Sequence, residues 1–389
     1  MIRALSVVLL MLLVVSTPFA DGKTVYEPPF MPQSAEVMAQ GGSFNANAKE
    51  FYSLFSNPAA YAGETSSFTL QSSMPWLYAF PEPAVFEALS AIGADPFGAI
   101  ANMNDLLTGP GFGAGASVGM GYVGNGLGLG LVGMTDVFAL GPNTLGINVD
   151  SHITVGFVGG FALPIQIGPL TLRIGGAFRP MYRVRVPKLG ISAFASMLSD
   201  DSDTAELTAP VYHGVGMALD GGVIAEVGPV VAGIAVRDLF DTSFQYSKST
   251  LTELIDALSI GSLPQGGEPV SDSVRYVIPM TVHFSAAFHP KLGGISKIID
   301  PIIHANYELP IVPEEEASSF WSSFHAGAEV AFFSLFKLRA GLNQGYLTAG
   351  IGLHLLFVDL NVAYFGRELG SFAGSKQNQG ISAELAFRF

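Results

Sequence analysis

Apolar and polar residues alternate with a period of two along most of this chain. In the last ten residues, GISAELAFRF, the side chains of Ile381, Leu385 and Phe389 share one parity, and those of Glu384 and Arg388 share the other. Successive side chains of a β-strand point to opposite faces, so this segment is predicted to be a strand with one apolar and one polar face. Soluble β-sandwiches and transmembrane β-barrels both use strands of this kind.

The same alternation predicts about fourteen antiparallel strands, most of them close to the roughly 9–11 residues that cross a membrane at a tilt. They are expected near residues 65–73, 111–122, 126–138, 147–162, 169–186, 211–224, 230–238, 275–288, 299–309, 321–332, 335–343, 345–356, 358–366 and 380–389.

The lengths of the connections separate the two candidate folds. Short connections, such as GNG at 124–126 and EVGP at 226–229, alternate with long ones, such as 187–210 and 239–274. A sandwich has no reason to sort its loops by length, whereas outer-membrane barrels have short turns on one side and long loops on the other. The alternation therefore favours a barrel.

Charged residues stay off the apolar parity within the expected strands. Between 275 and 288, Phe284 and Phe288 are expected to face outward, whereas Arg275 and His283 face inward. An Arg or Lys that faces lipid at mid-membrane costs about 2–4 kcal/mol, so a lipid-facing wall requires this separation.

The composition of the chain also favours a membrane barrel over a soluble sandwich. Hydrophobic residues make up 49% of the chain, charged residues only 13%, and the mean hydropathy is +0.43. No uninterrupted apolar run reaches the roughly 18 residues of a spanning helix, which leaves the closed barrel as the membrane-compatible fold. The chain has no cysteine, and its net charge of −14 offers no basic surface for nucleic acid.

The first twenty residues have the layout of a secretory signal peptide. Arg3 precedes an apolar stretch from Ala4 to Val15, and a cleavage site is expected near Ala20. A signal peptide over residues 1–20, followed by a barrel, implies the cell outer membrane. The alternative is a retained anchor helix, for which the apolar stretch is short.

Three of the long connections have helical patterns, at 83–107, 191–198 and 251–258. In the last of them, Thr250 and Glu253 fit a capping box ahead of an apolar stripe. Short helices with an apolar face in external loops pack either on the barrel mouth or on a hydrophobic ligand that enters there.

The expected strand at 169–186 carries four arginines on its inward parity: Arg173, Arg179, Arg183 and Arg185. Because guanidinium groups suit carboxylates and phosphates, Arg173, Arg179 and Arg183 are candidates for binding an anionic head group. The alternative is pairing with the N-terminal segment or with inward acids, of which Asp220, Glu329, Asp359 and Glu384 are candidates. Pro180 in mid-strand predicts a bulge or a local break in the wall.

No catalytic or metal-binding motif is present in the sequence. The glycines of GFGAGASVG alternate through a strand and do not join a strand to a helix, so they do not form a nucleotide-binding loop. The seven histidines have no zinc-site spacing, and neither HExxH nor GxSxG occurs. We therefore expect no enzyme activity, cofactor or metal, although a Ser/His pair in the lumen or at the rim stays open.

The segment EFYSLFSNPAAYA resembles the N-terminal signature of the long-chain fatty-acid transporter (FadL) family. Asn57, Pro58 and Ala59 match the NPA triplet of that family, whereas the glycine that usually follows is replaced by Ala60. Toward the other end, FHAGAEV, LRAGLNQGYLTAGIGL and NVAYFGRELG resemble the FadL-like outer-membrane proteins of spirochaetes, which are similar to PorV-type barrels.

The resemblance implies a fourteen-stranded barrel over residues 65–389 with a plug, residues 21–64, inside its lumen. Asn57, Pro58 and Ala59 would form the plug element. The implied function is passive diffusion of hydrophobic compounds, chiefly long-chain fatty acids, past the plug and out through a lateral opening. Membrane lipids and such a ligand are the expected partners of a monomer. The alternatives are a PorV-type barrel that receives or anchors secreted cargo, and an outer-membrane lipid hydrolase.

Overall fold

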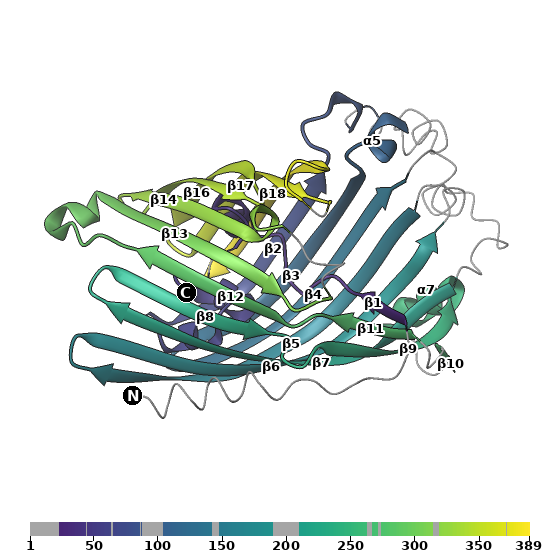
Figure 1. The fold of residues 1–389 in the computed structure, drawn as a ribbon, viewed down its shortest axis with the longest axis horizontal. Coiled ribbons are helices and arrows are strands. Elements are labelled where there is room, and N and C mark those ends of the chain that lie inside the picture. Colours follow the sequence, from purple (N-terminus) through teal and green to yellow (C-terminus); the bar gives the residue numbers. More distant parts are fainter. Residues whose placement is uncertain are drawn as a thin grey trace.

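The computed structural model describes residues 23–43, 45–63, 65–85, 87, 104–141, 148–189, 210–262, 267–270, 274–313, 319–370 and 372–389. Within these residues, the chain forms a closed antiparallel barrel whose long strands are steeply tilted (Figure 1). The signal peptide expected at 1–20 and the helix expected at 191–198 lie outside the described residues.

Fourteen wall strands close the barrel, as the alternation predicts. Two of them are interrupted, so each consists of two shorter strands. In chain order the wall strands are β2 (Ser67–Tyr78), β3 (Phe112–Gly124), β4 (Leu127–Leu140), β5 (Asn148–Ile167), β6 (Leu170–Leu189), β7 (Pro210–Val227), β8 (Val230–Arg237) continued by β9 (Thr242–Thr250), β11 (Val274–Ile278) continued by β12 (Thr281–Phe288), β13 (Ile299–Pro310), β14 (Phe324–Phe332), β15 (Phe336–Asn343), β16 (Tyr346–Leu355), β17 (Val358–Glu368) and β18 (Gln377–Arg388).

Pairing of β18 with β2 joins the two ends of the wall, and pairing of β8 with β12 makes the wall continuous in its middle. Two further short strands pair with the interrupted wall strands. β1 (Lys23–Tyr26) runs parallel to β11, and β10 (Glu268–Pro269) pairs with β9.

The prediction that 239–274 is a connection was wrong, because β9 lies within it. Asp238, Phe240 and Asp241 have positive φ angles, so the chain leaves the ladder after β8 and then rejoins it beside β7. In β9, Phe244 and Tyr246 are buried on the inside, whereas alternate residues on the outside are polar. In β9 the apolar residues therefore face inward and the polar residues outward, the reverse of a lipid-facing strand. For this reason the rule that apolar residues face outward did not predict β9.

The predicted separation of apolar and polar faces is confirmed in most of the wall. Val118 is 54% exposed and Ile351 is 60% exposed on the outer surface, whereas Asp359 and Glu384 on the inward parity are buried. The described helices include none that is long and apolar enough to cross a bilayer.

The expectation that Arg275 faces inward was wrong. Its neighbour Tyr276 pairs with Phe244 and packs against buried apolar side chains inside the barrel, so Arg275 lies on the outward parity of β11. The break at residues 279–280 reverses the parity between β11 and β12, and Phe284 does face outward as predicted.

Most short turns lie at one end of the barrel and most long connections at the other, where α5 (Asn104–Thr108) and α7 (Leu251–Ser259) lie (Figure 1). We call these the short-turn end and the long-loop end. The short turn between β15 and β16 is the exception, because it lies among the long connections. The helix expected at 251–258 is α7, and its capping box forms: Glu253 accepts from the Thr250 amide at 2.8 Å, and Thr250 Oγ1 accepts from the Glu253 amide at 3.3 Å. At the short-turn end, the β12–β13 connection contains η4 (Gly293–Lys297). At the long-loop end, η6 (Trp321–Ser323) precedes β14.

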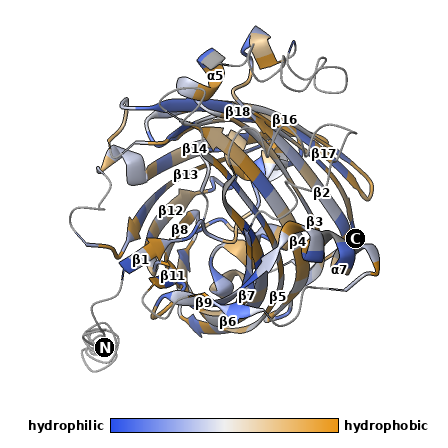
Figure 2. Cartoon of the chain, turned by 90° about the vertical axis from the view of Figure 1, so that its right-hand side faces the viewer, coloured by the Kyte–Doolittle hydropathy of each residue, from blue (hydrophilic) through white to orange (hydrophobic). Residues whose placement is uncertain are grey.

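Residues 27–43 and 45–63, called the inner segment here, lie inside the ring of strands (Figure 2). The inner segment contains α2 (Ala35–Ala39) and the two 3₁₀ helices η1 (Glu50–Phe55) and η2 (Pro58–Ala62). Most of its side chains are buried against the inward faces of the wall strands, so this segment occupies the middle of the barrel.

Candidate functional site

Asn57 fixes the inner segment to two neighbouring wall strands. Its Oδ1 accepts a hydrogen bond from the Ala59 amide at 3.0 Å, which caps η2, and Pro58 occupies the first position of that helix. Its Nδ2 donates to the carbonyl oxygens of Val223 on β7 and Ile234 on β8, at 3.3 and 3.2 Å. The side chain is fully buried, so one amide both shapes the turn and joins it to the wall.

Three wall glycines make room for this turn. Gly175 of β6 and Gly222 of β7 are cross-strand partners, and Gly233 of β8 lies on the same inward face opposite Ile224; we call the three glycines the glycine socket. A Cβ on Gly175 would lie 2.5 Å from the Pro58 carbonyl group, and a Cβ on Gly222 would overlap Asn57 Oδ1. In the sequence, this site is marked by the paired glycines in RIGGAF and DGGVIA, which carry no motif that links them to the NPA triplet.

On the opposite side, polar contacts join the inner segment to β13–β18. Glu36 lies 3.5 Å from Arg339, the Tyr52 hydroxyl donates to Glu384, and Glu50 lies 3.5 Å from Arg388. Wall side chains also bind inner-segment backbone: Thr348 Oγ1 donates to the Ala39 carbonyl at 3.0 Å, His325 Nδ1 lies 2.7 Å from the Gly41 carbonyl oxygen, and Asn306 Nδ2 donates to the Ser43 carbonyl at 2.7 Å.

The three arginines predicted to bind an anionic head group each contact a protein carboxylate. Arg173 pairs with Glu226, Arg179 with Asp220 at 2.6 Å and Asp238 at 3.0 Å, and Arg183 with Glu27 of the inner segment at 3.2 Å. Arg185 also binds Glu27, at 2.7 Å. The structure therefore shows the pairing that the sequence offered as the alternative, with Asp220 among the acids named for it. The head-group role stays a prediction.

The interrupted strands leave a seam in the wall between β7 and β9. Pairing of β7 with β9 ends at Gly216, and pairing of β7 with β8 starts at Gly221. A cavity of about 530 Å³ lies at this seam, lined by Val155, Pro180, Met181, Tyr182, Val215, Gly216, Met217, Ser243 and Gln245. Most of these side chains lie on the outer surface, but Met181 also belongs to the apolar cluster around the inner segment.

Pro180 borders this cavity and interrupts the ladder between β5 and β6. Partners are formed up to Gly156–Met181 and again from Gly159–Phe178, without a change of register. Of the two outcomes predicted for Pro180, the wall has the local break and not the bulge, because proline removes a donor without adding a residue.

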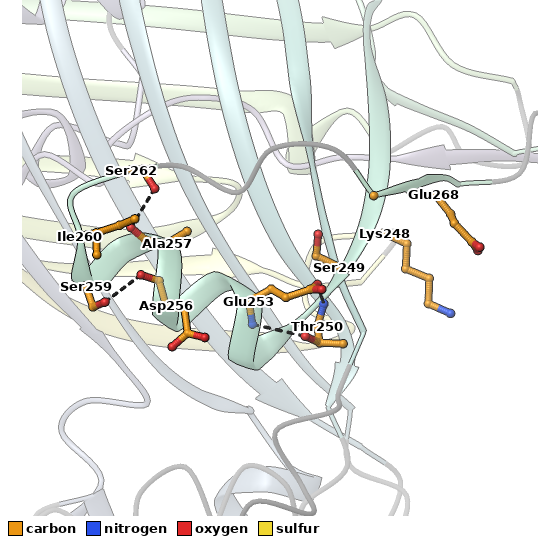
Figure 3. A pocket seen from close by; sticks show the side chains of 11 residues that line it. Lys248, Ser249, Thr250, Glu253, Asp256, Ala257, Ser259, Ile260, Ser262 and Glu268 are labelled. Carbon is orange, nitrogen blue, oxygen red and sulfur yellow. Dashed lines mark hydrogen bonds between the residues drawn. The ribbon is translucent and has the colours of Figure 1, made fainter.

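A second cavity, of about 920 Å³, opens at the long-loop end between α7 and β9 (Figure 3). Most of the residues that line it are polar, among them Lys248, Glu253, Asp256 and Glu268. The apolar residues Leu251 and Leu254 of α7 face the other way, into a buried cluster at the strand ends. Packing on the barrel mouth therefore accounts for the apolar face of this helix.

A Ser/His pair is present on the outer side of β7 and β9. Ser249 Oγ lies 2.8 Å from His213 Nε2, and the Tyr182 hydroxyl lies 2.9 Å from His213 Nδ1. Ser249 also borders the rim cavity. The arrangement has the order of a Ser-His-acid triad, with a phenol in the place of the carboxylate. Among the described residues, no group of three or more His, Cys, Asp or Glu side chains is placed to hold a metal ion.

The fourteen-stranded wall, with the inner segment inside it, places this chain in the class of large, closed, antiparallel β-barrels. No protein-family model and no curated protein matches the sequence. Among solved structures, the toluene transporter TodX of Pseudomonas putida aligns over 92% of this chain and 98% of its own, with 12% identity and a TM-score of 0.50. A FadL homologue of Pseudomonas aeruginosa aligns over 95% of this chain and 99% of its own, with 13% identity and a TM-score of 0.46. The match to TodX shows a shared fold.

Proposed function

We propose that this protein is a FadL-type channel of the cell outer membrane, through which hydrophobic compounds diffuse passively. The observation that carries the proposal is the interior of the barrel. Phe30, Phe51, Leu54, Phe55 and Tyr61 of the inner segment form one apolar cluster with the wall, in place of the water-filled lumen of a porin. An apolar solute needs an apolar path, because transfer of its apolar surface into the water of an open pore has an unfavourable free energy.

In this proposal, the outward apolar band faces membrane lipid and the long-loop end faces the outside, as in outer-membrane barrels generally. The inner segment is the plug, and Asn57, Pro58 and Ala59 hold it in the glycine socket. The shared fold with a toluene transporter supports a hydrophobic ligand. Long-chain fatty acids are the class that the NPA resemblance indicates.

We place the lateral exit at the seam between β7 and β9. The 530 Å³ cavity there reaches from the lipid-facing side chains Val215 and Met217 to Met181 of the inner cluster. A molecule that has passed the plug would enter the membrane through this cavity. Arg173, Arg179 and Arg183 would bind a ligand carboxylate in exchange for their acidic partners.

Uptake measurements test the proposal. Cells that lack other hydrophobic channels but express this protein should take up a radiolabelled long-chain fatty acid faster than cells with an empty vector. If the purified, folded barrel neither speeds uptake nor protects a fluorescent fatty acid from solvent, the transport proposal fails and the fold is unaffected.

The Ser249–His213 pair supports a second candidate function, hydrolysis of ester-linked lipids. Ser249 would be the nucleophile, His213 its base, and Tyr182 would orient the imidazole. A fluorogenic acyl ester assay decides this: turnover that Ser249→Ala abolishes supports a hydrolase. Equal signals from wild type, Ser249→Ala and empty detergent contradict it.

A further inference from the structure

The lipid-facing surface of the wall is short on one side of the barrel. β8 and β12 have only eight residues each, from the breaks to the short-turn end. On the other side of the breaks, outward side chains are polar or charged, among them Ser243 and Gln245 of β9 and Arg275 of β11. An arginine that faces lipid is costly, so on this strip of the wall the lipid begins near the breaks.

The same boundary continues on the neighbouring strands. Phe320 and Trp321, at the long-loop end just before β14, are 56% and 54% exposed. The ring of Phe320 stacks on that of Tyr307 of β13, with ring centroids 5.2 Å apart. Trp and Tyr gather where a membrane meets water, so this aromatic cluster marks the boundary there. From it to the short-turn end, β14 has nine residues, and the adjacent β15 has eight.

These strands are too short to cross the apolar layer of a membrane with length to spare. At about 3.4 Å per residue and a tilt of about 35–45°, eight residues rise about 19–22 Å and nine about 22–25 Å, whereas the apolar band of an outer-membrane barrel is about 25 Å tall. β3 and β4, with 13 and 14 residues, rise about 31–39 Å. Lipid that begins at the breaks and at the aromatic cluster therefore extends to or past the short turns on this side.

The side chains at those short turns are apolar and exposed. Ile295 of η4 is 59% exposed, Phe333 of the β14–β15 turn 67%, and Leu356 of the β16–β17 turn 89%. Phe333 and Leu356 have φ angles of 54° and 55°, in the left-handed region that favours Gly or Asn in a turn. With a φ of 53°, the β3–β4 turn has Asn125. On the short side of the wall, apolar residues thus occupy positions that suit polar turn residues in water.

Backbone hydrogen bonds join these turns into one edge. The Phe333 amide donates to the Ile298 carbonyl oxygen at 2.9 Å, which ties the β14–β15 turn to the end of η4. The His354 amide donates to the Leu335 carbonyl oxygen at 2.8 Å, which ties the same turn to the end of β16. We call this edge the apolar rim; it consists of the exposed residues Leu292, Ile295, Ile298, Phe333, Leu356 and Phe357.

Lipid is the partner that fits the apolar rim. The rim continues the outward apolar surface of β15, in which Leu338 is 52% exposed. Lys291 and Lys297 lie on either side of Ile295 and are exposed, whereas Asp300 is paired with His289 at 2.7 Å. Lysine side chains in such a place can extend from an apolar surface to the phosphate groups at the edge of a membrane.

We propose that the apolar rim is inserted among the acyl chains of the inner leaflet, with Lys291 and Lys297 at the level of the phospholipid phosphates. The short turns on this side lie in the membrane, whereas the β3–β4 turn on the other side lies in water, so the lipid boundary crosses the short-turn end obliquely. This inference rests on the membrane location in the proposed function, but it does not depend on transport.

Spin labels test the proposal, because the chain has no native cysteine. Phe333→Cys and Asn125→Cys are a matched pair, since both residues lie in short turns and have φ angles of 54° and 53°. Ile351→Cys, on the outer wall, is the control for lipid. In vesicles of phosphatidylethanolamine and phosphatidylglycerol, the label at 333 should collide with oxygen more often than with a water-soluble nickel chelate, as at 351. The oxygen-to-nickel ratio should be several-fold lower at 125.

Three results would overturn the inference. A label that meets water at 333 and lipid at 351 contradicts the inserted rim and leaves the membrane location intact. Labels that meet water at both positions contradict the membrane location as well. A label at 333 that meets neither reagent would mean that a second copy of the chain covers the rim.

A substitution that suits the turn gives an independent reading. Asn adopts a positive φ more readily than Phe, so Phe333→Asn should stabilise the folded barrel if this turn lies in water. In lipid, the same change should lower the urea midpoint of unfolding from vesicles, because contacts with acyl chains are lost. Ser334→Asn, in the same turn and with a φ of 55°, exchanges two polar residues and should not lower the midpoint. A midpoint that stays or rises in Phe333→Asn contradicts the proposal. Heat-modifiable migration on a gel shows that each variant is folded.

Discussion

Gly222 and Asn57 are in such close contact that a Cβ on Gly222 would overlap the Oδ1 of Asn57. Gly221, the next residue along β7, has open space at the same position. The pair therefore offers a matched test of how the inner segment is seated, because the two glycines share a strand and differ in what they face.

Gly222→Ala is expected to dislodge the turn at Asn57, because overpacking of a tight contact costs about 1–3 kcal/mol. Limited proteolysis of the folded barrel should cut the inner segment faster in Gly222→Ala than in wild type. Gly221→Ala should be cut at the wild-type rate. Equal protection of the two variants would show that the glycine socket does not hold the turn.

Replacing Asn57 separates its two roles. Asn57→Asp keeps an oxygen for the Ala59 amide but loses the donor to the Val223 and Ile234 carbonyls, and it brings a charge into a buried site. The loss of these hydrogen bonds is expected to weaken docking by about 1–3 kcal/mol, with a further cost from the charge. Asn57→Ser, which is neutral and a good helix cap, should weaken docking of the inner segment less than Asn57→Asp does. Hydrogen exchange over residues 57–63 measures the effect, and an Asp variant as protected as wild type would contradict it.

Acid should weaken the contact of the inner segment with β13–β18, because Glu36 takes part in it. Burial alone would raise the pKa of this carboxyl, but Arg339, Lys337 and Lys49 hold it well below its usual value of 4.5. A group with a depressed pKa stabilises the folded state fully above its unfolded pKa, so this contribution is complete at neutral pH and declines as the pH falls below about 4.5. Hydrogen exchange over α2, corrected for intrinsic rates, should speed up in acid. Glu36→Gln should exchange faster at neutral pH and show a smaller acid effect; an unchanged acid response in that variant would assign the effect to another group.

The β17–β18 connection is organised around one carboxylate. Glu368 accepts hydrogen bonds from the amides of Gly370, Gly374 and Lys376, and from the Tyr346 hydroxyl. Glu368→Ala should release this connection, at a cost of about 1.5–3 kcal/mol for hydrogen bonds to a charged group. Exchange of the amides at 372–376 should rise while the inner segment stays protected, and fatty-acid uptake should not change. Loss of protection in the inner segment as well would show that this connection and the interior are coupled.

The wall could be predicted from the sequence because each lipid-facing strand carries its own signal. Ile351 and Val118 alternate with small or polar residues within a few positions, and this local period fixes which face is turned to lipid. The break after β8 could not be predicted, because it depends on three positive φ angles at residues that are not glycine. Beyond it, Phe244 faces the inner cluster instead of lipid, so the outward pattern gives no signal there.

The site depends on contacts between residues far apart in the chain. The NPA triplet could be found by its resemblance to a family motif, but its seat on Gly175, Gly222 and Gly233 requires the strand register, which only the folded wall sets. For the same reason, the sequence suggested Asp220 and the N-terminal segment as partners of the arginines, but it did not identify Glu27 as the residue of that segment that contacts Arg183.

The most direct test of the account compares two tracers in the same proteoliposomes. A plugged, apolar path predicts that the purified barrel speeds transfer of a long-chain fatty acid into the vesicles while a small sugar stays outside. Rapid entry of the sugar, with no effect on the fatty acid, would mean that the interior is a water-filled pore and would contradict the central claim.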